Sequence, residues 1–462
     1  MAVFPRAVAL VLVASACTSG GVASTSTVSP TDAASPVAPE PGGIVRTPSD
    51  PDYLVHLRGD ATGRTWRGWE EVAFTNTDAA PLDLVWLRLW SNGIDGCDPK
   101  AISISDPSSG SLAAPTVGCT AVRVDLDAPL EPGARTSLRF DLRILVPSRN
   151  DRFGAAHGMS LLGTPLPTLA VHDDRGWHLD PFVAFGESFY SVVGSYRVTL
   201  DVPKDLATPT TGSTEGVRTA ADREIRTFVA EDSRDFEWAA GAFRELTDRV
   251  GDTLVRVSYL PDLVGDQDAA RMLGVARDAM TTFRDAFGPY PYPEVDVVLT
   301  AFRRYGGMEY PQLVFVNPKA TYLTHELAHQ WWFGIVGNDE YAEPWLDESL
   351  ATWSMFLPIR PWLGCHDPSW PSPTARITND MAYWSDHQQE YATIYRGGGC
   401  MFADLARRFG LDRIEEILAG YAESNRFDVA RADDLIGAFD RAAAADLPDL
   451  DMAAYWSRWR VG

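Results

Sequence analysis

Residues 324–332 read Thr-His-Glu-Leu-Ala-His-Gln-Trp-Trp, and this stretch decides how the second half of the chain is interpreted. On a helix, four residues advance about 400°, so His325 and His329 lie on one face, one turn apart. Two imidazole nitrogens can then reach a single metal ion, while Glu326 projects to its side. The stretch predicts that His325 and His329 bind zinc and that Glu326 is the base that takes a proton from an attacking water.

Taken alone, the five residues His-Glu-Leu-Ala-His at 325–329 could instead belong to an amphipathic helix without a metal, with two half-buried histidines and a surface glutamate. A third candidate ligand argues against it. Glu348 follows His329 by 19 residues, within Trp-Leu-Asp-Glu-Ser-Leu-Ala at 345–351. The glycines at 334 and 337 allow a second helix to return and place Glu348 against the first. Zinc sites need at least three protein ligands, and these three residues supply them.

The pattern His-Glu-x-x-His, eighteen residues, then Glu resembles the gluzincin pattern of the aminopeptidase N family of zinc metallopeptidases. Gly-Gly-Met-Glu-Tyr at 306–310 is similar to the family's Gly-x-Met-Glu-Asn loop, and Tyr-Arg-Gly-Gly at 395–398 is similar to its Tyr-x-Lys-Gly segment. The resemblance covers residues from about 50 to 462 and is strongest between 288 and 400.

The resemblance implies one zinc per chain, held by His325, His329 and Glu348, with Glu326 as the general base. It implies that Tyr395 donates a hydrogen bond to the oxyanion of the tetrahedral intermediate formed during peptide hydrolysis. The substrate-binding loop would be formed by Gly306, Gly307, Met308 and Glu309, with Glu309 binding the α-amine of the peptide.

The chain departs from the family pattern at four positions. Tyr310 replaces Asn, Arg396 replaces Lys, and Asp347 and Ser349 replace the common Asn and Gly beside the third ligand. The family takes a second amine-binding group from its β domain, and we assign no residue to it; Glu187, in the loop Phe-Gly-Glu-Ser at 185–188, is left without a role.

Three functions compete on these residues. The leading hypothesis is a zinc aminopeptidase that acts on peptides. The second is a metallo-endopeptidase, or an epoxide-hydrolysing relative, on the same zinc site. An amine-binding carboxylate at Glu309 favours the exopeptidase. The third is a lipoprotein binding module without catalysis, and the intact base Glu326 argues against it.

The first residues are typical of an export signal. Arg6 gives a minimal positive region, a short apolar run follows at 7–14, and Ala14-Ser15-Ala16 precedes Cys17. The pattern predicts a signal peptide at 1–16 and favours lipidation of Cys17 over ordinary cleavage after Ala16. Residues 17–48 are rich in Ser, Thr, Pro, Ala and Gly, which predicts a disordered tether. We expect an envelope protein anchored to the outer face of the cell membrane, or otherwise a secreted one.

The charge and the cysteine content indicate which partners and cross-links to expect. The formal net charge of −23, without a block of Lys or Arg, argues against nucleic acid as a partner. No obligate protein partner is inferred. Apart from Cys17, four cysteines remain, and an even number in an exported chain suggests two disulfides. Proximity favours Cys97 with Cys119 and Cys365 with Cys400, although three pairings are possible.

The overall pattern predicts an α+β protein. Residues 49–247 contain strand-like runs separated by turn residues, which indicates an antiparallel β-saddle or sandwich domain. From 248 to 462 the period becomes helical, and the resemblance implies a thermolysin-like zinc peptidase domain that runs from α/β to all-helical. We expect a compact member that lacks the helical C-terminal domain of many relatives.

Overall fold

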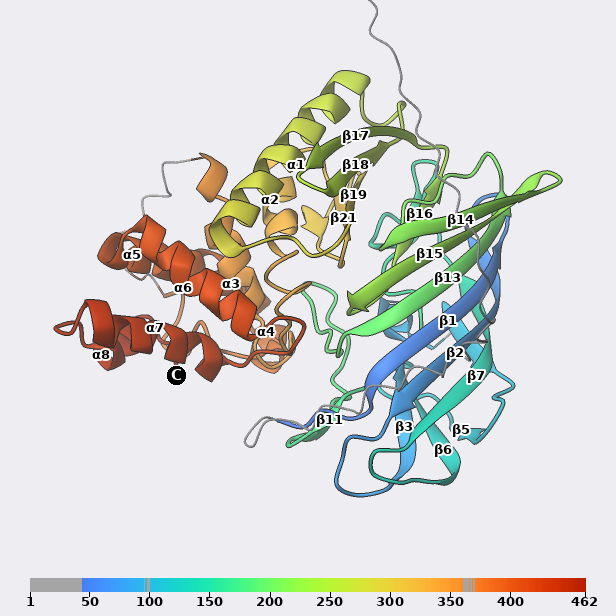
Figure 1. The fold of residues 1–462 in the computed structure, drawn as a ribbon, viewed down its shortest axis with the longest axis horizontal. Helices are drawn as coiled ribbons and strands as arrows, with labels where there is room; N and C mark the ends of the chain where they lie inside the picture. The colour runs from blue at the N-terminus through green and yellow to red at the C-terminus, as the bar shows by residue number, and fades with distance from the viewer. Residues whose placement is uncertain (1–43, 95, 98–99, 360–364, 366–367, 369) are drawn as a thin grey trace, which may run out of the picture. The chain divides into compact units, whose positions relative to one another are not determined.

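The computed structural model describes residues 44–94, 96–97, 100–359, 365, 368 and 370–462. The predicted signal peptide, Cys17 and the tether as far as Gly43 lie outside the described residues. The residues from Ile44 to Gly462 form one compact unit, in which the first half is built from sheets and the second half mainly from helices (Figure 1).

A large sheet organises the first half. Its strands alternate apolar and polar side chains, so that one face of each strand, such as Tyr53, Val55 and Leu57 in the first, enters the core. All neighbours are antiparallel except β1 and β13, which run parallel. The strand order is β14 (Ser213–Ala220), β15 (Arg223–Ser233), β13 (Gly194–Pro203), β1 (Ser49–Gly59), β2 (Thr65–Thr75), β7 (Arg135–Leu145) and β4 (Ile102–Ser105).

Smaller sheets complete this half. Val85 and Val124 of a four-stranded sheet share one core with Val55 and Leu142 of the large sheet, which confirms the predicted β-rich domain. The four-stranded sheet has the order β10 (Thr168–Leu169), β3 (Leu82–Arg88), β6 (Ala121–Leu130) and β5 (Ser111–Leu112). Three further strands, β16 (Trp238–Gly241), β9 (Met159–Leu162) and β8 (Phe153–Ala156), form another sheet, and β11 (His172–Asp173) and β12 (Gly176–Trp177) form a hairpin.

A five-stranded mixed sheet begins the second half, and α1 (Asp266–Phe287) lies against it (Figure 1). Ala276, Met280, Phe283 and Phe287 are buried at helical spacing on one face of α1. The helix ends at Gly288, whose φ of 102° suits glycine. The strand order is β17 (Arg244–Val250), β18 (Thr253–Tyr259), β19 (Glu294–Leu299), β21 (Leu313–Val316) and β20 (Gly307–Met308), so this sheet begins a few residues before 248.

The remaining chain is helical, as the change of period predicted. Long helices bury Trp353, Phe402 and Phe439 in the same core as α1. The helices are α2 (Ala320–Ala328), α3 (Trp345–Ser354), α4 (Met381–Asp386), α5 (Gly398–Phe409), α6 (Leu411–Ser424), α7 (Ala432–Asp446) and α8 (Met452–Arg458), with short turns η1 (Trp90–Ile94), η2 (Leu357–Ile359), η3 (Gln388–Glu390) and η4 (Thr393–Gly397).

Residues 44–48, which composition assigned to the tether, lie against the folded unit instead. Thr47 exchanges two backbone hydrogen bonds with His172. Arg46 donates to the hydroxyl of Tyr190 at 2.9 Å and pairs with Asp428 at 2.9 Å. The prediction from composition therefore placed the start of the fold too late. It failed because the residues that hold this segment lie far along the chain.

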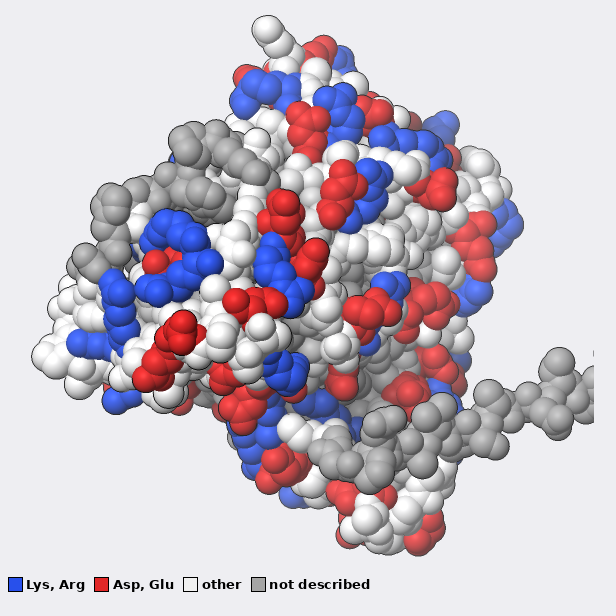
Figure 2. All heavy atoms as spheres, turned by 60° about the vertical axis from the view of Figure 1, so that its left-hand side comes forward, with Lys and Arg blue, Asp and Glu red and all other residues white. Residues whose placement is uncertain are grey.

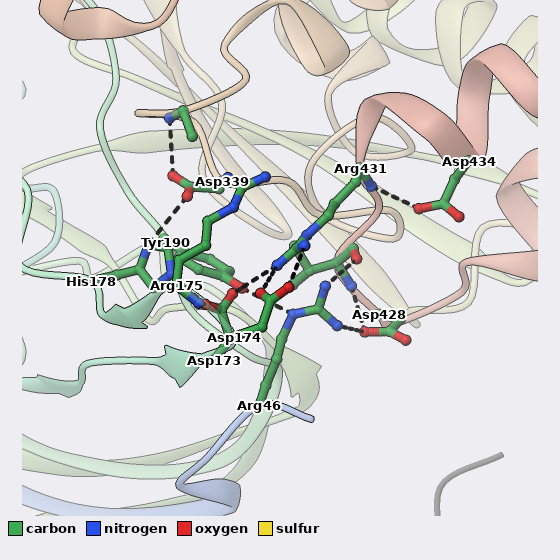
Figure 3. A network of polar contacts seen from close by, with 12 residues as sticks. Arg46, Asp173, Asp174, Arg175, His178, Tyr190, Asp339, Asp428, Arg431 and Asp434 are labelled. Carbon is green, nitrogen blue, oxygen red and sulfur yellow. Dashed lines mark hydrogen bonds and ion pairs between the residues drawn. The ribbon is translucent and has the colours of Figure 1, made fainter. Parts of the chain in front are cut away.

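A polar network joins the two halves near this segment (Figure 3). Asp173 and Asp174, in and beside the β11–β12 hairpin, accept hydrogen bonds from Arg431, the residue that caps the start of α7. On the other side, the Nδ1 of His178 lies 3.2 Å from Asp339, which belongs to the connection between α2 and α3. The network therefore ties the β half to the segment that links the two helices of the predicted metal site.

His178 makes the stability of this network depend on pH. Its ring lies between Asp173, Asp180 and Asp339. Burial by itself lowers the pKa of His178, but hydrogen bonds and charges from Asp339 and Asp173 outweigh burial and raise the pKa above 6.5. Because the folded pKa exceeds the unfolded one, the protonated ring stabilises the fold below pH 6.5, and this contribution is lost as the pH rises through the folded pKa.

We therefore expect His178→Gln to lower the Tm more near pH 5.5 than near pH 8.5, as measured by thermal unfolding of both proteins at the two pH values. His157→Gln, at a histidine outside the network, is the matched control for the loss of an imidazole. A Tm deficit of H178Q that stays constant or grows toward alkaline pH contradicts this prediction.

The two disulfides that proximity favoured are confirmed: Cys97 bonds to Cys119, and Cys365 bonds to Cys400. Among the described residues, no helix combines the length and the apolarity that a membrane span requires. On the face drawn in Figure 2, acidic and basic side chains are interspersed rather than separated into large fields of one sign.

Candidate active site

The three predicted ligands come together at the ends of two helices. The Nε2 atoms of His325 and His329 lie 3.2 Å apart, and an Oε2 of Glu348 lies 3.1 Å from the first and 3.4 Å from the second. His325 lies in the last turn of α2, His329 directly follows that helix, and Glu348 lies in the first turn of α3. The helical repeat and the returning second helix therefore produce the juxtaposition that the spacing predicted.

This donor set fits zinc, which takes imidazole nitrogen and carboxylate oxygen in sites of three protein ligands. The Nδ1 of His329 lies 3.0 Å from the carbonyl oxygen of Trp332, an outer contact that orients the ring and turns Nε2 toward the cluster. Burial by itself raises the pKa of Glu348, but hydrogen bonds to His325 and His329 outweigh burial and lower it.

Tryptophans after the motif hold the two ligand helices together. Trp331 and Trp332 are buried, as expected for core residues. The indole of Trp332 donates to Ser354 at the end of α3 at 2.9 Å, and the indole of Trp331 donates to the carbonyl of Gly288 after α1 at 3.2 Å. The first bond fixes the segment after α2 relative to α3, which carries the third ligand, and the second fixes it relative to α1.

Glu326 lies beside the cluster and lines a cavity of about 530 Å³. Burial raises the pKa of Glu326 to about 8, His329 opposes this shift, and the carboxylates of Glu348 and Glu187 add to it. A divalent cation on the three ligands would favour the ionised carboxylate and lower this pKa. Gly307 packs directly on the base: a Cβ at this position would lie 2.4 Å from an Oε1 of Glu326. A side chain at position 307 would therefore displace the carboxylate of Glu326.

Glu309 lines the same cavity from the loop after β20, the edge strand of the five-stranded sheet. The residue is only 4% exposed, and its Oε1 has no hydrogen-bond partner. Burial and the nearby carboxylates of Glu187 and Glu326 raise its pKa well above the ordinary value. A buried acceptor without a partner is costly, so this atom is suited to a cationic ligand.

The predicted substrate loop divides between the cavity and the core. Gly306 and Gly307 line the cavity, as predicted. Met308 is buried on the other side of β20 and receives a hydrogen bond from Arg152 through its sulfur at 3.2 Å. The alternation of side chains along a strand explains this division. Tyr310, the departure from Asn, is buried in a space left by Gly163, where a Cβ would lie 1.8 Å from the phenol oxygen.

Sequence reasoning missed one carboxylate of the cavity. Glu187, from the β half, offers an oxygen within 4.8 Å of oxygens of Glu309 and Glu348. Arg152 donates to it at 2.8 Å. Burial raises the pKa of Glu187 to about 7, and the charge of Arg152 opposes the shift. The only signal in the sequence was a glycine-containing loop, which has no spacing relationship to the zinc motif.

Tyr395 lies within η4, a π-helical turn before α5, and its side chain lines the cavity. Its hydroxyl donates to Oε1 of Glu348 at 2.5 Å, so it stands next to the ligand cluster. Ser349, a departure from the family's Gly, donates to the carbonyl of Ile394 at 2.7 Å and contacts Gly398 closely. These contacts hold the turn of Tyr395 against α3. Arg396, the departure from Lys, is exposed.

Comparisons with known proteins agree with this geometry. Residues 271–459 match the model of the peptidase family M1 domain. Aminopeptidase M1 of Arabidopsis thaliana is 22% identical over 301 residues, which cover 57% of this chain and 34% of that protein. A probable aminopeptidase 2 of Sulfurisphaera tokodaii is 28% identical over 178 residues, covering 34% and 22%. The chain thus spans about a third or less of the length of these curated relatives.

Solved structures share the fold over most of the chain. A two-domain M1 zinc metallopeptidase bound to L-arginine has a TM-score of 0.61 at 18% identity and covers 90% of this chain and 94% of that one. An M1 zinc metallopeptidase from Deinococcus radiodurans has a TM-score of 0.60 at 19% identity, with the same coverage. Residues 271–459 are thus similar to the peptidase family M1 domain, and the chain shares the fold of solved M1 zinc metallopeptidases.

Proposed function

We propose that this protein is a zinc-dependent aminopeptidase that removes residues from the free N-terminus of peptides, with one zinc per chain. The observation that carries the proposal is the buried Oε1 of Glu309, which has no partner and lines the cavity beside the metal cluster. An endopeptidase does not need a buried carboxylate at this position, whereas an exopeptidase needs one to bind the α-ammonium.

His325, His329 and Glu348 would hold the zinc, which when bound acts as a Lewis acid on the peptide carbonyl and makes water a stronger acid. Glu326 takes the proton of the attacking water and returns it to the leaving amine. Tyr395 donates a hydrogen bond to the oxygen that gains negative charge.

Substrate placement would use both halves of the chain. Glu309 and Glu187 would bind the α-ammonium from two sides. Carboxylate oxygens of Glu187, Glu309 and Glu348 all lie within 4.8 Å of one another. The edge strand β20 can add the extended peptide as a further strand through its backbone. The lack of side chains at Gly306 and Gly307 lets Tyr322 and Glu326 pack directly against this strand.

The test compares peptides with a free N-terminus and the same peptides after N-acetylation. We expect the wild type to cleave only the free peptides efficiently. Glu309→Gln should raise KM for free peptides about tenfold to a hundredfold, because a charge-assisted hydrogen bond of roughly 1.5–3 kcal/mol is lost. Cleavage of the acetylated peptides at the same rate by the wild type would instead favour the endopeptidase.

We also propose that the protein is exported and anchored to the outer face of the cell membrane through lipid on Cys17. The positive residue, the short apolar run and the small residues before Cys17 support this proposal. The variant Cys17→Ser should move the protein from the membrane fraction to the soluble fraction. Equal membrane retention of both proteins would refute a lipid anchor.

A further inference from the structure

We propose that Arg152 is the positioning residue of the amine subsite, and that it determines how strictly the enzyme requires a free N-terminus. The inference rests on the proposed aminopeptidase function. Arg152 comes from the β half, immediately before β8, and its guanidinium contacts both loops that carry the amine-binding carboxylates.

One set of contacts holds the loop of Glu187. The Nη1 of Arg152 donates to Oε1 of Glu187 at 2.8 Å, and Nη2 donates to the carbonyls of Val183 and Gly186 at 3.2 and 3.0 Å. The loop from 183 to 187 contains no strand or helix. Arg152 binds two backbone carbonyls of this loop and its carboxylate together, and the backbone of Val183 also donates to Ser188.

The other set of contacts reaches the loop of Glu309. The same Nη1 lies 3.2 Å from the sulfur of Met308, the residue directly before Glu309. The backbone nitrogen of Arg152 lies 2.5 Å from the hydroxyl of Tyr305, which directly precedes Gly306. Arg152 thus bonds to both ends of the segment from 305 to 308 as well as to Glu187.

The charge of the cavity favours a buried cation here. Four carboxylates line it: Glu187, Glu309, Glu326 and Glu348. When all four are ionised, a zinc ion and a substrate ammonium together offset three of their charges, and Arg152 offsets the fourth. A net charge left inside a buried site is costly. The other basic residue of the cavity wall, Lys319, is exposed to solvent and is less able to offset it.

Arginine suits this position better than lysine. Its planar fork presents five donors in a fixed arrangement and remains charged when buried. The side chain is 7% exposed, and its guanidinium lies 5.2 and 5.4 Å from the ring centres of Phe182 and Phe189. A lysine ammonium would keep the charge but could not bond to both loops and both carbonyls at once.

The experiment measures kcat and KM of wild type, R152M, R152K, E187Q and the double variant R152M/E187Q on paired free and N-acetylated peptides. For R152M we expect KM for free peptides to rise at least tenfold and the preference for free over acetylated peptides to fall by the same factor, with little change in kcat for acetylated peptides. R152K should recover part of the preference. The double variant should lose no more preference than R152M alone, because Arg152 acts through Glu187.

Arg234→Met is the matched control. Arg234 is another fully buried arginine that donates to three backbone carbonyls, those of Ser191, Phe333 and Asp428, away from the cavity. We expect R234M to lower the Tm as R152M does, without altering the preference for free peptides. If R152M lowers the Tm but keeps the wild-type preference, Arg152 has only a structural role and the inference is overturned.

The test remains decisive when R152M does not fold, and it separates a failure of the aminopeptidase proposal from a failure of the role of Arg152. If R152M does not fold, a folded R152K with undiminished preference overturns the inference, whereas a partial loss supports it. If the wild type itself shows no preference for free peptides, the aminopeptidase proposal fails first, and this result is separate from any effect of Arg152.

Discussion

Replacement of Glu326 by Gln should reduce kcat for peptide hydrolysis by about a hundredfold to ten-thousandfold, the range expected when a general base is removed. The amide has nearly the same shape, so the contact with Gly307 persists, but it cannot accept the proton of the attacking water. Because Glu326 is not a ligand, E326Q should retain about one zinc per chain. Steady-state kinetics together with metal analysis of the purified protein check both expectations.

Glu70→Gln is the matched control, since Glu70 is a fully buried glutamate in β2 of the β half. It should leave the turnover of peptides unchanged while it tests the general effect of neutralising a buried carboxylate. Undiminished turnover in E326Q would exclude Glu326 as the base. A wild-type protein that contains no zinc and cannot be reconstituted with it would refute the zinc site altogether.

The variant Tyr395→Phe should have the second large effect, a fall in kcat of about a hundredfold to a thousandfold with little change in KM. The phenol is proposed to bond to an oxygen that becomes negative only during the reaction, so the ground state loses little when the hydroxyl is removed. Kinetics on free peptides separate the two constants.

Tyr383→Phe is the control for this variant. The hydroxyl of Tyr383 also contacts a carboxylate, Glu390, at 3.3 Å, but it does not line the cavity. It should leave kcat unchanged. A Y395F enzyme whose KM rises while kcat is maintained would show that the phenol binds the substrate rather than stabilising the transition state.

The sequence predicted those parts of the site whose residues lie close together along the chain. His325 and His329 are one helical turn apart, and Glu348 begins the next long helix, so short-range geometry was enough to group them. The disulfides likewise join cysteines that are near neighbours in the sequence. The change to a helical period after 248 was also a local signal, and α1 buries one face at that spacing.

The residues that sequence reasoning missed lie far from the motif. Arg152 and Glu187 reach the cavity only because the sheets of the first half pack beside the helices of the second. No periodicity links a loop at 187 to a helix at 325, so their proximity depends on tertiary structure alone. The same reason applies to Arg46, whose bonds to Tyr190 and Asp428 draw residues assigned to a tether into the fold.

Both halves of the chain contribute to the cavity wall: the metal cluster, the base and Glu309 come from the second half, and Glu187 and Arg152 come from the first. Under the proposed mechanism, the groups that break the bond lie in the second half, whereas the α-ammonium is bound by Glu309 of that half and by Glu187 of the first. Mutations in the β half can therefore change which chain ends are accepted without touching the groups that break the bond. The β half can in this sense adjust the requirement for a free N-terminus independently of the hydrolytic step.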